Sequence, residues 1–135
     1  MNAKERERIL ATLDKCESIT DVGAHFDSLL KIREDFNSDA EKRRLQDLLT
    51  AIGNEDRLLL LDALKEKDRC VCELEVIVGK SQPAVSHHLK ILERNNLIRG
   101  WKKGKFTHYS LVKKTIEEFN HIWENWTKKI SNWLS

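Results

Sequence analysis

The order of three consecutive segments constrains the fold of this chain more than any other feature. Residues 70–78 and 82–94 carry apolar side chains at helical spacing, and Gly79 lies between the two runs. Residues 97–101 and 106–111 then alternate as strands do, around a basic centre at residues 102–105. Two short helices with a glycine-containing turn, followed by a hairpin, form a winged helix-turn-helix. We therefore predict a mainly α fold with a small β-wing, and place this motif at about residues 54–111.

Local signals support these boundaries. Ser81 is suited to cap the second helix, and Pro83 falls in its first turn, where the missing proline N–H has no cost. Within that helix the spacing of Val85, Leu89 and Leu92 predicts the buried face. Asn95 and the residue after it end the helix, so the chain is free to enter the predicted wing.

Helices are also expected on both sides of the motif, at about residues 3–13, 21–36, 39–52, 55–65 and 113–134. A Ser38–Asp39–Ala40–Glu41 capping box starts the third of these, and Gly53 is expected to end it in the left-handed conformation. The helix at 55–65 is apolar nearly all round, which predicts a core position. This organisation divides the chain into an N-terminal helical extension (1–44), a winged helix-turn-helix core (45–112) and a C-terminal dimerisation helix (113–135).

Positive charge is concentrated in one part of the chain. Residues 79–114 hold nine Lys and Arg against the single acid Glu93, a formal charge of +8, which leaves −6 for the remainder of a chain of net charge +2. Such asymmetry is typical of a protein that binds a phosphate backbone. In a helix-turn-helix the second helix enters the major groove. The expected DNA contacts are therefore Ser81, Gln82, Ala84, Ser86, His87 and Lys90 on the helix, and Lys102, Lys103 and Lys105 on the wing.

Several classes of protein are disfavoured by the sequence. The N-terminus lacks the apolar core of a signal peptide, and no apolar run approaches the length of a membrane span, so a cytoplasmic protein without membrane partners is expected. The cysteines number three, which argues against a structural disulfide framework. There is no glycine-rich phosphate loop, nucleophile elbow or paired carboxylate constellation, so an enzyme is not expected.

The last predicted helix carries more aromatic side chains on one stripe than a small core needs. We expect this stripe to form the interface of a homodimer. Its members are Ile116, Phe119, Trp123, Trp126 and Ile130.

Two stretches carry a specific family resemblance. SQPAVSHHLKILERNNLIRGWKKGKFTHYSL (residues 81–111) resembles the recognition helix and wing of the arsenic-repressor (ArsR/SmtB) family, and AIGNEDRLLLLDAL (residues 51–64) resembles the helix that precedes them. The resemblance covers roughly residue 45 to the C-terminus. It implies a homodimeric repressor that binds a double-stranded DNA operator and leaves it when an inducer binds. Residues 1–36 are not explained by it.

The same resemblance bears on the cysteines. Cys70-Val71-Cys72-Glu73-Leu74 resembles the segment from which many sensors of this family take thiolate ligands, which implies a soft effector such as As(III), Cd(II), Pb(II) or Zn(II). Two thiolates are too few for a closed site. The third cysteine of arsenic sensors in the family corresponds to Glu75 here. Other members take a thiolate from the N-terminal segment, so the resemblance implies Cys16 as a further ligand.

Three other interpretations stay open for this segment. Cys70 and Cys72 could be small buried hydrophobes, as free cysteines often are. They could form a thiol redox switch, because a neighbouring Arg69 favours the thiolate. The whole chain could also be a constitutive winged-helix protein that binds DNA or another partner without sensing a metal.

Overall fold

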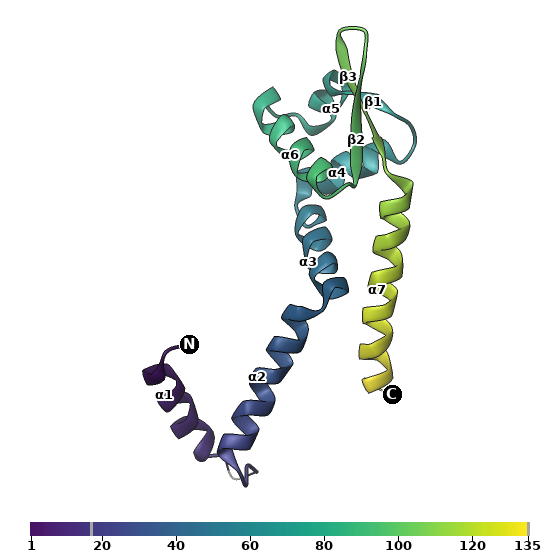
Figure 1. Ribbon diagram of the computed structural model, residues 1–135. Coiled ribbons are helices and arrows are strands. Elements are labelled where there is room, and N and C mark those ends of the chain that lie inside the picture. Colours follow the sequence, from purple (N-terminus) through teal and green to yellow (C-terminus); the bar gives the residue numbers. More distant parts are fainter. Residues whose placement is uncertain (17, 135) are drawn as a thin grey trace. The chain divides into compact units, whose positions relative to one another are not determined.

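The computed structural model describes residues 1–16 and 18–134. Its elements are α1 (Ala3–Asp14), α2 (Val22–Ser38), α3 (Ala40–Ile52), α4 (Glu55–Leu64), β1 (Arg69–Cys70), α5 (Val71–Val78), α6 (Gln82–Arg94), β2 (Ile98–Lys103), β3 (Phe106–Leu111) and α7 (Lys113–Leu134) (Figure 1). The predicted mainly helical fold with a small wing is confirmed. The chain divides into two compact units, Met1–Arg43 and Arg44–Ser135.

The first unit is a pair of helices, α1 and α2. A capping box between Asn2 and Glu5 starts α1, and the Asp21 carboxylate caps α2 as predicted. Phe26 is buried, with the Arg6 guanidinium 5.0 Å from its ring centre.

The predicted boundary between α2 and α3 is wrong. Ser38 stays within α2, where its hydroxyl donates to the Asp35 carbonyl, and is not an N-cap. Asp39 leaves the helical conformation instead, and its carboxylate accepts hydrogen bonds from the backbone N–H of Glu41 and Lys42 at 3.0 and 3.1 Å. An aspartate side chain is as good an N-cap as serine, so the cap shifts by one residue.

The second unit contains one hydrophobic core. Its members come from α3 to α6 and from the segment that enters the wing: Leu48, Ala51, Leu60, Leu61, Leu64, Leu74, Val85, Leu89, Leu92, Leu97 and Ile98. Val85, Leu89 and Leu92 are each no more than 1% exposed, which confirms the predicted buried face of α6. This face fixes which side of α6 is left for solvent or a ligand.

Helix α4 is less buried than its composition predicted, and α3 also exposes one of its leucines. In α4 the side chains of Leu58 and Leu59 are exposed, so the expectation of an all-round core helix is wrong. Leu49 of α3 is exposed as well. A helix packed in a small two-layer core can bury one side only, whatever the composition of the other.

A three-stranded antiparallel sheet, of order β1-β3-β2, forms the wing. The hairpin pairs Ile98 with Leu111 at its base and Lys103 with Phe106 at its tip. In Figure 1 this hairpin projects beyond the neighbouring helices. Strand β1 was not predicted. In it, Cys70 pairs with His108 of β3, and Arg69 pairs with Tyr109. The predicted helix over residues 70–78 therefore begins one residue later, and Cys70 is its N-cap.

Gly79 and Gly53 serve two different purposes in this unit. Gly79 ends α5 in the left-handed conformation, with φ of 71°. The prediction of a left-handed Gly53 is wrong. Among the described glycines, only Gly79 and Gly104 have positive φ. A Cβ at Gly53 would instead lie 2.8 Å from the Leu49 carbonyl oxygen, so this position needs glycine for close backbone approach.

None of the described helices is long and apolar enough to cross a membrane.

Candidate nucleic-acid interface

The first turn of α6 carries a connected group of polar side chains. The Ser81 hydroxyl accepts a hydrogen bond from the Ala84 N–H at 3.4 Å, as a cap should. One turn along, the Gln82 side-chain amide donates to the Ser86 hydroxyl at 3.1 Å. Gln82 is exposed, so this pair places an amide and a hydroxyl, groups that can donate and accept hydrogen bonds, at the surface of α6.

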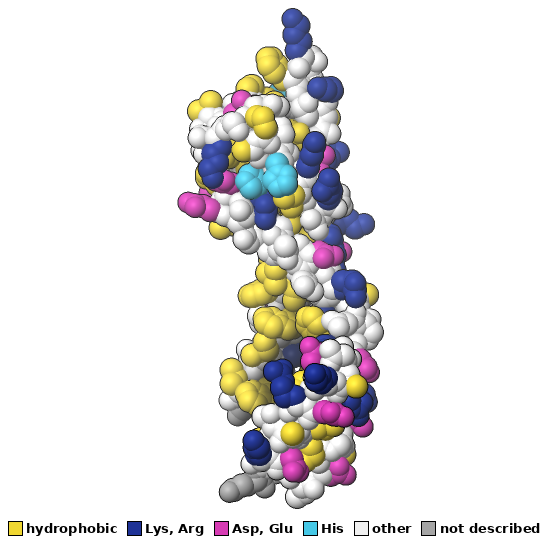
Figure 2. All heavy atoms as spheres, turned by 90° about the vertical axis from the view of Figure 1, so that its left-hand side faces the viewer, with side chains coloured by type: hydrophobic (Ala, Val, Ile, Leu, Met, Phe, Trp, Pro, Cys, Tyr) yellow, Lys and Arg dark blue, Asp and Glu magenta, His cyan; other side chains and the backbone are white. Residues whose placement is uncertain are grey.

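The other predicted contacts of α6 differ in exposure. His87 and Lys90 are exposed, whereas Ala84 is half-buried. On the face of the molecule shown in Figure 2, histidine side chains lie among Lys and Arg side chains. By helical spacing, the exposed His87 and Lys90 lie on the side of α6 away from its buried residues Val85, Leu89 and Leu92.

A polar cluster that the sequence analysis missed fixes α6 to its neighbours. His88 Nε2 lies 3.4 Å from Asp56 Oδ2, and His88 Nδ1 lies 3.1 Å from Arg57 Nη1. Asp56 also pairs with Lys80 in the turn between α5 and α6. Arg57 donates to the Ala51 carbonyl through Nε, and through Nη2 to another carbonyl in the last turn of α3. We call Asp56, Arg57, Lys80 and His88 the α6 anchor.

The electrostatics of the anchor keep its histidine neutral. Burial lowers the pKa of His88, and the nearby Arg57 charge lowers it further. Arginine can only donate, so Nδ1 of His88 must accept and Nε2 must carry the proton that faces Asp56. The hydrogen bond from Lys80 lowers the pKa of the Asp56 carboxyl. The only sequence signal for this cluster is its residue types, because it depends on long-range packing.

The basic residues of the wing lie close together at its tip. Lys102 and Lys103 belong to β2, so the predicted four-residue tip is wrong, and the turn itself consists of Gly104 and Lys105. Gly104 has φ of 64°, the conformation that a tight hairpin turn requires. Lys102, Lys103 and Lys105 are all exposed. Figure 1 shows the turn at the free end of the hairpin, and Figure 2 shows Lys or Arg side chains at the top of its view.

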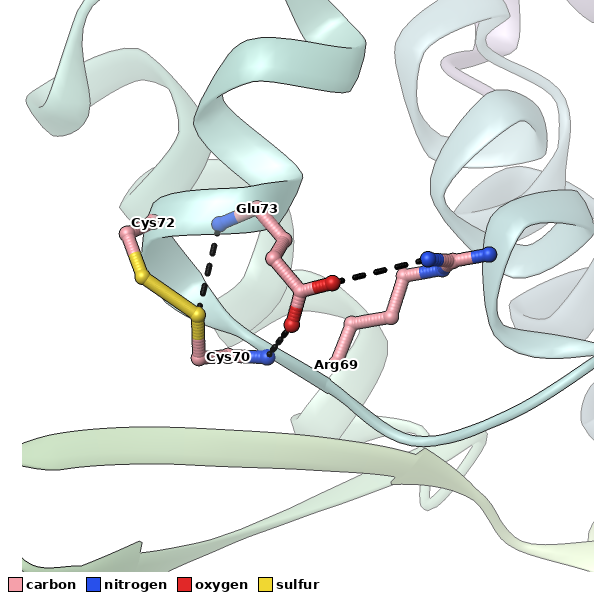
Figure 3. The surroundings of a disulfide bond; sticks show 4 residues. All are labelled: Arg69, Cys70, Cys72 and Glu73. Atoms are coloured by element: carbon pink, nitrogen blue, oxygen red, sulfur yellow. Dashed lines mark hydrogen bonds and ion pairs between the residues drawn. A yellow bond between two sulfur atoms is a disulfide. The ribbon is translucent and has the colours of Figure 1, made fainter.

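The cysteine pair lies where the sheet meets the helix-turn-helix (Figure 3). Cys70 and Cys72 are joined by a disulfide, with their Cα atoms 5.4 Å apart, a bond that the sequence analysis did not predict. Cys70 Sγ also accepts a hydrogen bond from the Glu73 N–H at 3.4 Å, and Glu73 Oε1 accepts one from the Cys70 N–H at 3.1 Å. This capping box starts α5, and it lowers the pKa of the Glu73 carboxyl.

The described residues do not complete a metal site around this pair. No group of three or more His, Cys, Asp or Glu side chains suited to a metal ion occurs among residues 1–16 and 18–134. Cys16, the third predicted ligand, is exposed and lines an open pocket of the first unit with Ile19, Asp21 and His25. Two sulfurs alone do not satisfy tetrahedral zinc, which takes four ligands in closed sites.

The predicted stripe of α7 has two parts. Ile116 and Phe119 are half-buried and pack against the core of the second unit. Trp123, Trp126 and Ile130 are 38%, 36% and 40% exposed, so this part of the helix leaves a large apolar face uncovered. The Phe119, Trp123 and Trp126 rings contact one another in series, with centroids 6.3 and 5.7 Å apart.

Known proteins share this domain. The profile of the family described as "Bacterial regulatory protein, arsR family" matches residues 54–99. The transcriptional repressor SdpR of Bacillus subtilis is 30% identical over 88 residues, covering 65% of this chain and 98% of that protein. The arsenical resistance operon repressor of Escherichia coli is 40% identical over 67 residues, covering 47% of this chain and 56% of that protein. The solved structure of reduced HlyU from Vibrio cholerae is 32% identical with a TM-score of 0.53, covering 59% and 82%.

These similarities agree with the geometry of the second unit. The relatives are transcriptional regulators and not enzymes, and the residues matched by the family profile contain α4, α5, α6 and the first two residues of β2. The chain is a winged-helix, DNA-binding transcriptional regulator that belongs to the ArsR family.

Proposed function

We propose that this protein is a homodimeric, sequence-specific repressor in the cytoplasm. It would recognise base pairs of its operator with α6 and contact the DNA phosphate backbone with the wing. The observation that carries this proposal is the hydrogen-bonded Gln82–Ser86 pair on the exposed side of a helix whose other side is in the core. Gln82 and Ser86 would contact base edges, since glutamine pairs with adenine through two hydrogen bonds. Ser81, Ala84, His87 and Lys90 would line the same groove, and Lys102, Lys103 and Lys105 would contact phosphates.

Selection from a randomised duplex library tests this proposal. The purified protein should enrich a defined sequence with two similar half-sites about one helical turn apart, as expected of a dimeric helix-turn-helix. Affinity for the enriched duplex should exceed affinity for a scrambled duplex by a factor of about a thousand or more. Equal affinity for both duplexes would contradict sequence-specific repression.

A second copy of this chain is the proposed occupant of the exposed face of α7. Trp123, Trp126 and Ile130 form an apolar surface continuous with the part of α7 that packs on the core, and aromatic residues are enriched in interfaces between subunits. Trp126→Ala should shift the protein toward monomer in sedimentation velocity, because central aromatic residues contribute most of the affinity of such interfaces. Val76→Ala removes an exposed apolar side chain on α5 and serves as the control. An unchanged dimer in Trp126→Ala would place the interface elsewhere.

We further propose that the Cys70–Cys72 pair controls operator binding by oxidation. A two-electron oxidant such as hydrogen peroxide converts one thiolate to a sulfenic acid, and the second thiolate displaces water to form the disulfide. The N-terminus of α5 places partial positive charge near the Cys70 sulfur, which favours the thiolate, whereas Arg69 pairs with the Glu73 carboxylate, 3.6 Å away. The similar solved structure from Vibrio cholerae is described as reduced HlyU, so its redox state is stated.

A soft metal or metalloid is the second candidate effector. The similar E. coli repressor belongs to an arsenical resistance operon. Reduced Cys70 and Cys72 would supply two sulfur donors, and Cys16 stays the predicted third ligand to be tested by substitution. As(III), Cd(II), Pb(II) and Zn(II) are the ions to test, because thiolates prefer soft metals.

One titration separates these effectors. Affinity for the enriched duplex is measured with reductant, with peroxide, and with reductant plus each ion, for the wild type and for Cys72→Ser. Loss of affinity with peroxide that Cys72→Ser abolishes supports oxidation, whereas loss only with an ion supports metal sensing. Unchanged affinity in every condition identifies a constitutive winged-helix protein. Cys16→Ser is the matched control for peroxide, because its sulfur lies outside the pair.

A further inference from the structure

One aromatic side chain of the wing has no role in the fold described above. Phe106 is 53% exposed and follows Lys105 at the tip of the hairpin, where it pairs with Lys103. The core-packing residues of the hairpin are Ile98, Tyr109 and Leu111, which lie on the opposite face from Phe106 because side chains alternate along a strand. Single exposed apolar residues are common, so the surroundings of Phe106 decide what it can do.

The face of the hairpin that carries Phe106 alternates cationic and aromatic groups. Trp101 stacks on His108 across the strands, with ring centroids 6.0 Å apart. The Arg99 guanidinium lies 5.6 Å from the Trp101 ring centre. Lys103 and Phe106 continue the series to the tip. These cross-strand contacts stabilise the hairpin on the face that carries Phe106.

The charge of the hairpin identifies the partner. Residues 98–111 include Arg99, Lys102, Lys103 and Lys105 and no acidic residue. An aromatic ring between lysines fits a groove walled by phosphates, and the groove lies within reach of a domain that binds DNA through α6. A protein partner with an apolar pocket offers no comparable match to this charge.

We propose that Phe106 enters the minor groove of operator DNA as an apolar wedge between two base pairs, with Lys103 and Lys105 on the flanking phosphates. This inference rests on the proposed repressor function and deepens it. Apolar wedges partly unstack a base step and kink the duplex. The wedge therefore favours a flexible pyrimidine–purine step at the place where the wing contacts the operator, and the wing contributes to sequence preference without hydrogen bonds to bases.

The test compares Phe106→Ala with Lys103→Ala, its partner across the strands. Kd for the enriched duplex and for a scrambled duplex is measured over a series of salt concentrations. Phe106→Ala should weaken binding to the enriched duplex about tenfold with the salt dependence unchanged, since it removes an apolar contact and no charge. Lys103→Ala should reduce the salt slope by roughly one phosphate contact. Phe106→Leu, which keeps an apolar wedge, should retain most of the affinity.

A fluorescent base reports the unstacking directly. With 2-aminopurine placed in turn at each position of the enriched duplex, wild-type protein should raise the emission at one step in the region contacted by the wing, and Phe106→Ala should not. Unchanged Kd and emission in Phe106→Ala would overturn the wedge while DNA binding stands. A fall in salt slope equal to that of Lys103→Ala would also overturn it, because Phe106 would then only position the lysines. If the wild type prefers no duplex, both the wedge and the proposed function fail.

Discussion

The first turn of α6 and the tip of the wing are both assigned to DNA, but their side chains are held to very different degrees. Gln82 is bonded to Ser86, and the helix beneath them is fixed through His88 to Asp56 and Arg57. The wing tip instead exposes lysines on long, flexible stems around a tight turn. A preformed polar pair favours discrimination between bases, whereas flexible cations favour any phosphate backbone. Under the proposed function, α6 would therefore discriminate between bases by hydrogen bonds, and the lysines of the wing would bind the phosphate backbone.

Breaking the α6 anchor should have the largest effect. Arg57→Ala removes the hydrogen bonds that join the end of α3 to His88, and we expect the free energy of unfolding to fall by about 2 to 3 kcal/mol. Urea denaturation followed by circular dichroism measures this. Arg33→Ala, at an exposed position of α2, is the control and should change stability little. Equal stability of the two variants would mean that α6 is held by its apolar face alone.

Removing the Gln82 side chain should have a different effect on DNA binding from removing a lysine of the wing. Gln82→Ala should cost about 1 to 3 kcal/mol of binding to the enriched duplex and leave binding to a scrambled duplex nearly unchanged, because a bidentate base contact is sequence-specific. Lys103→Ala should weaken both duplexes to the same degree. Competition anisotropy with the two duplexes measures the ratio. If both variants lowered the two affinities equally, α6 would not be the reading element.

The smallest expected effect is a pH dependence that belongs to the anchor. The folded protein holds the pKa of His88 below its ordinary value of 6.5 through burial and the Arg57 charge. The stability it contributes is therefore complete above 6.5 and is lost as the pH falls through the lowered pKa. Between about pH 7 and about pH 5 the wild type should lose more stability than His88→Gln, which does not titrate. Parallel pH curves for the two proteins would contradict a neutral His88.

Sequence reasoning reached the recognition helix because its signals are local. Ser81, Pro83 and the spacing of Val85, Leu89 and Leu92 define the start and the buried face of α6, and each acts within a few residues. The same locality accounts for the two errors of capping, at Ser38 and Gly53. In both places the expected cap conformation competes with an equally local alternative, an aspartate one residue on and a close backbone contact.

What sequence reasoning missed depends on contacts between distant segments. The two-residue strand β1 exists only because β3 pairs with it, so no periodicity within residues 65–70 could reveal it. The α6 anchor joins residues 24 to 32 positions apart, and its polar side chains are individually unremarkable in a list of charged residues. The exposure of Leu58 likewise follows from which side of α4 meets the core.

The structural roles of Cys70 do not depend on the reactivity of its thiol. Its backbone pairs with β3 and its sulfur caps α5, and serine performs the capping role at least as well as cysteine. A cysteine codon becomes a serine codon by a single nucleotide change. A lineage of such regulators can therefore gain or discard thiol reactivity at this position while the domain keeps its shape and its hold on DNA.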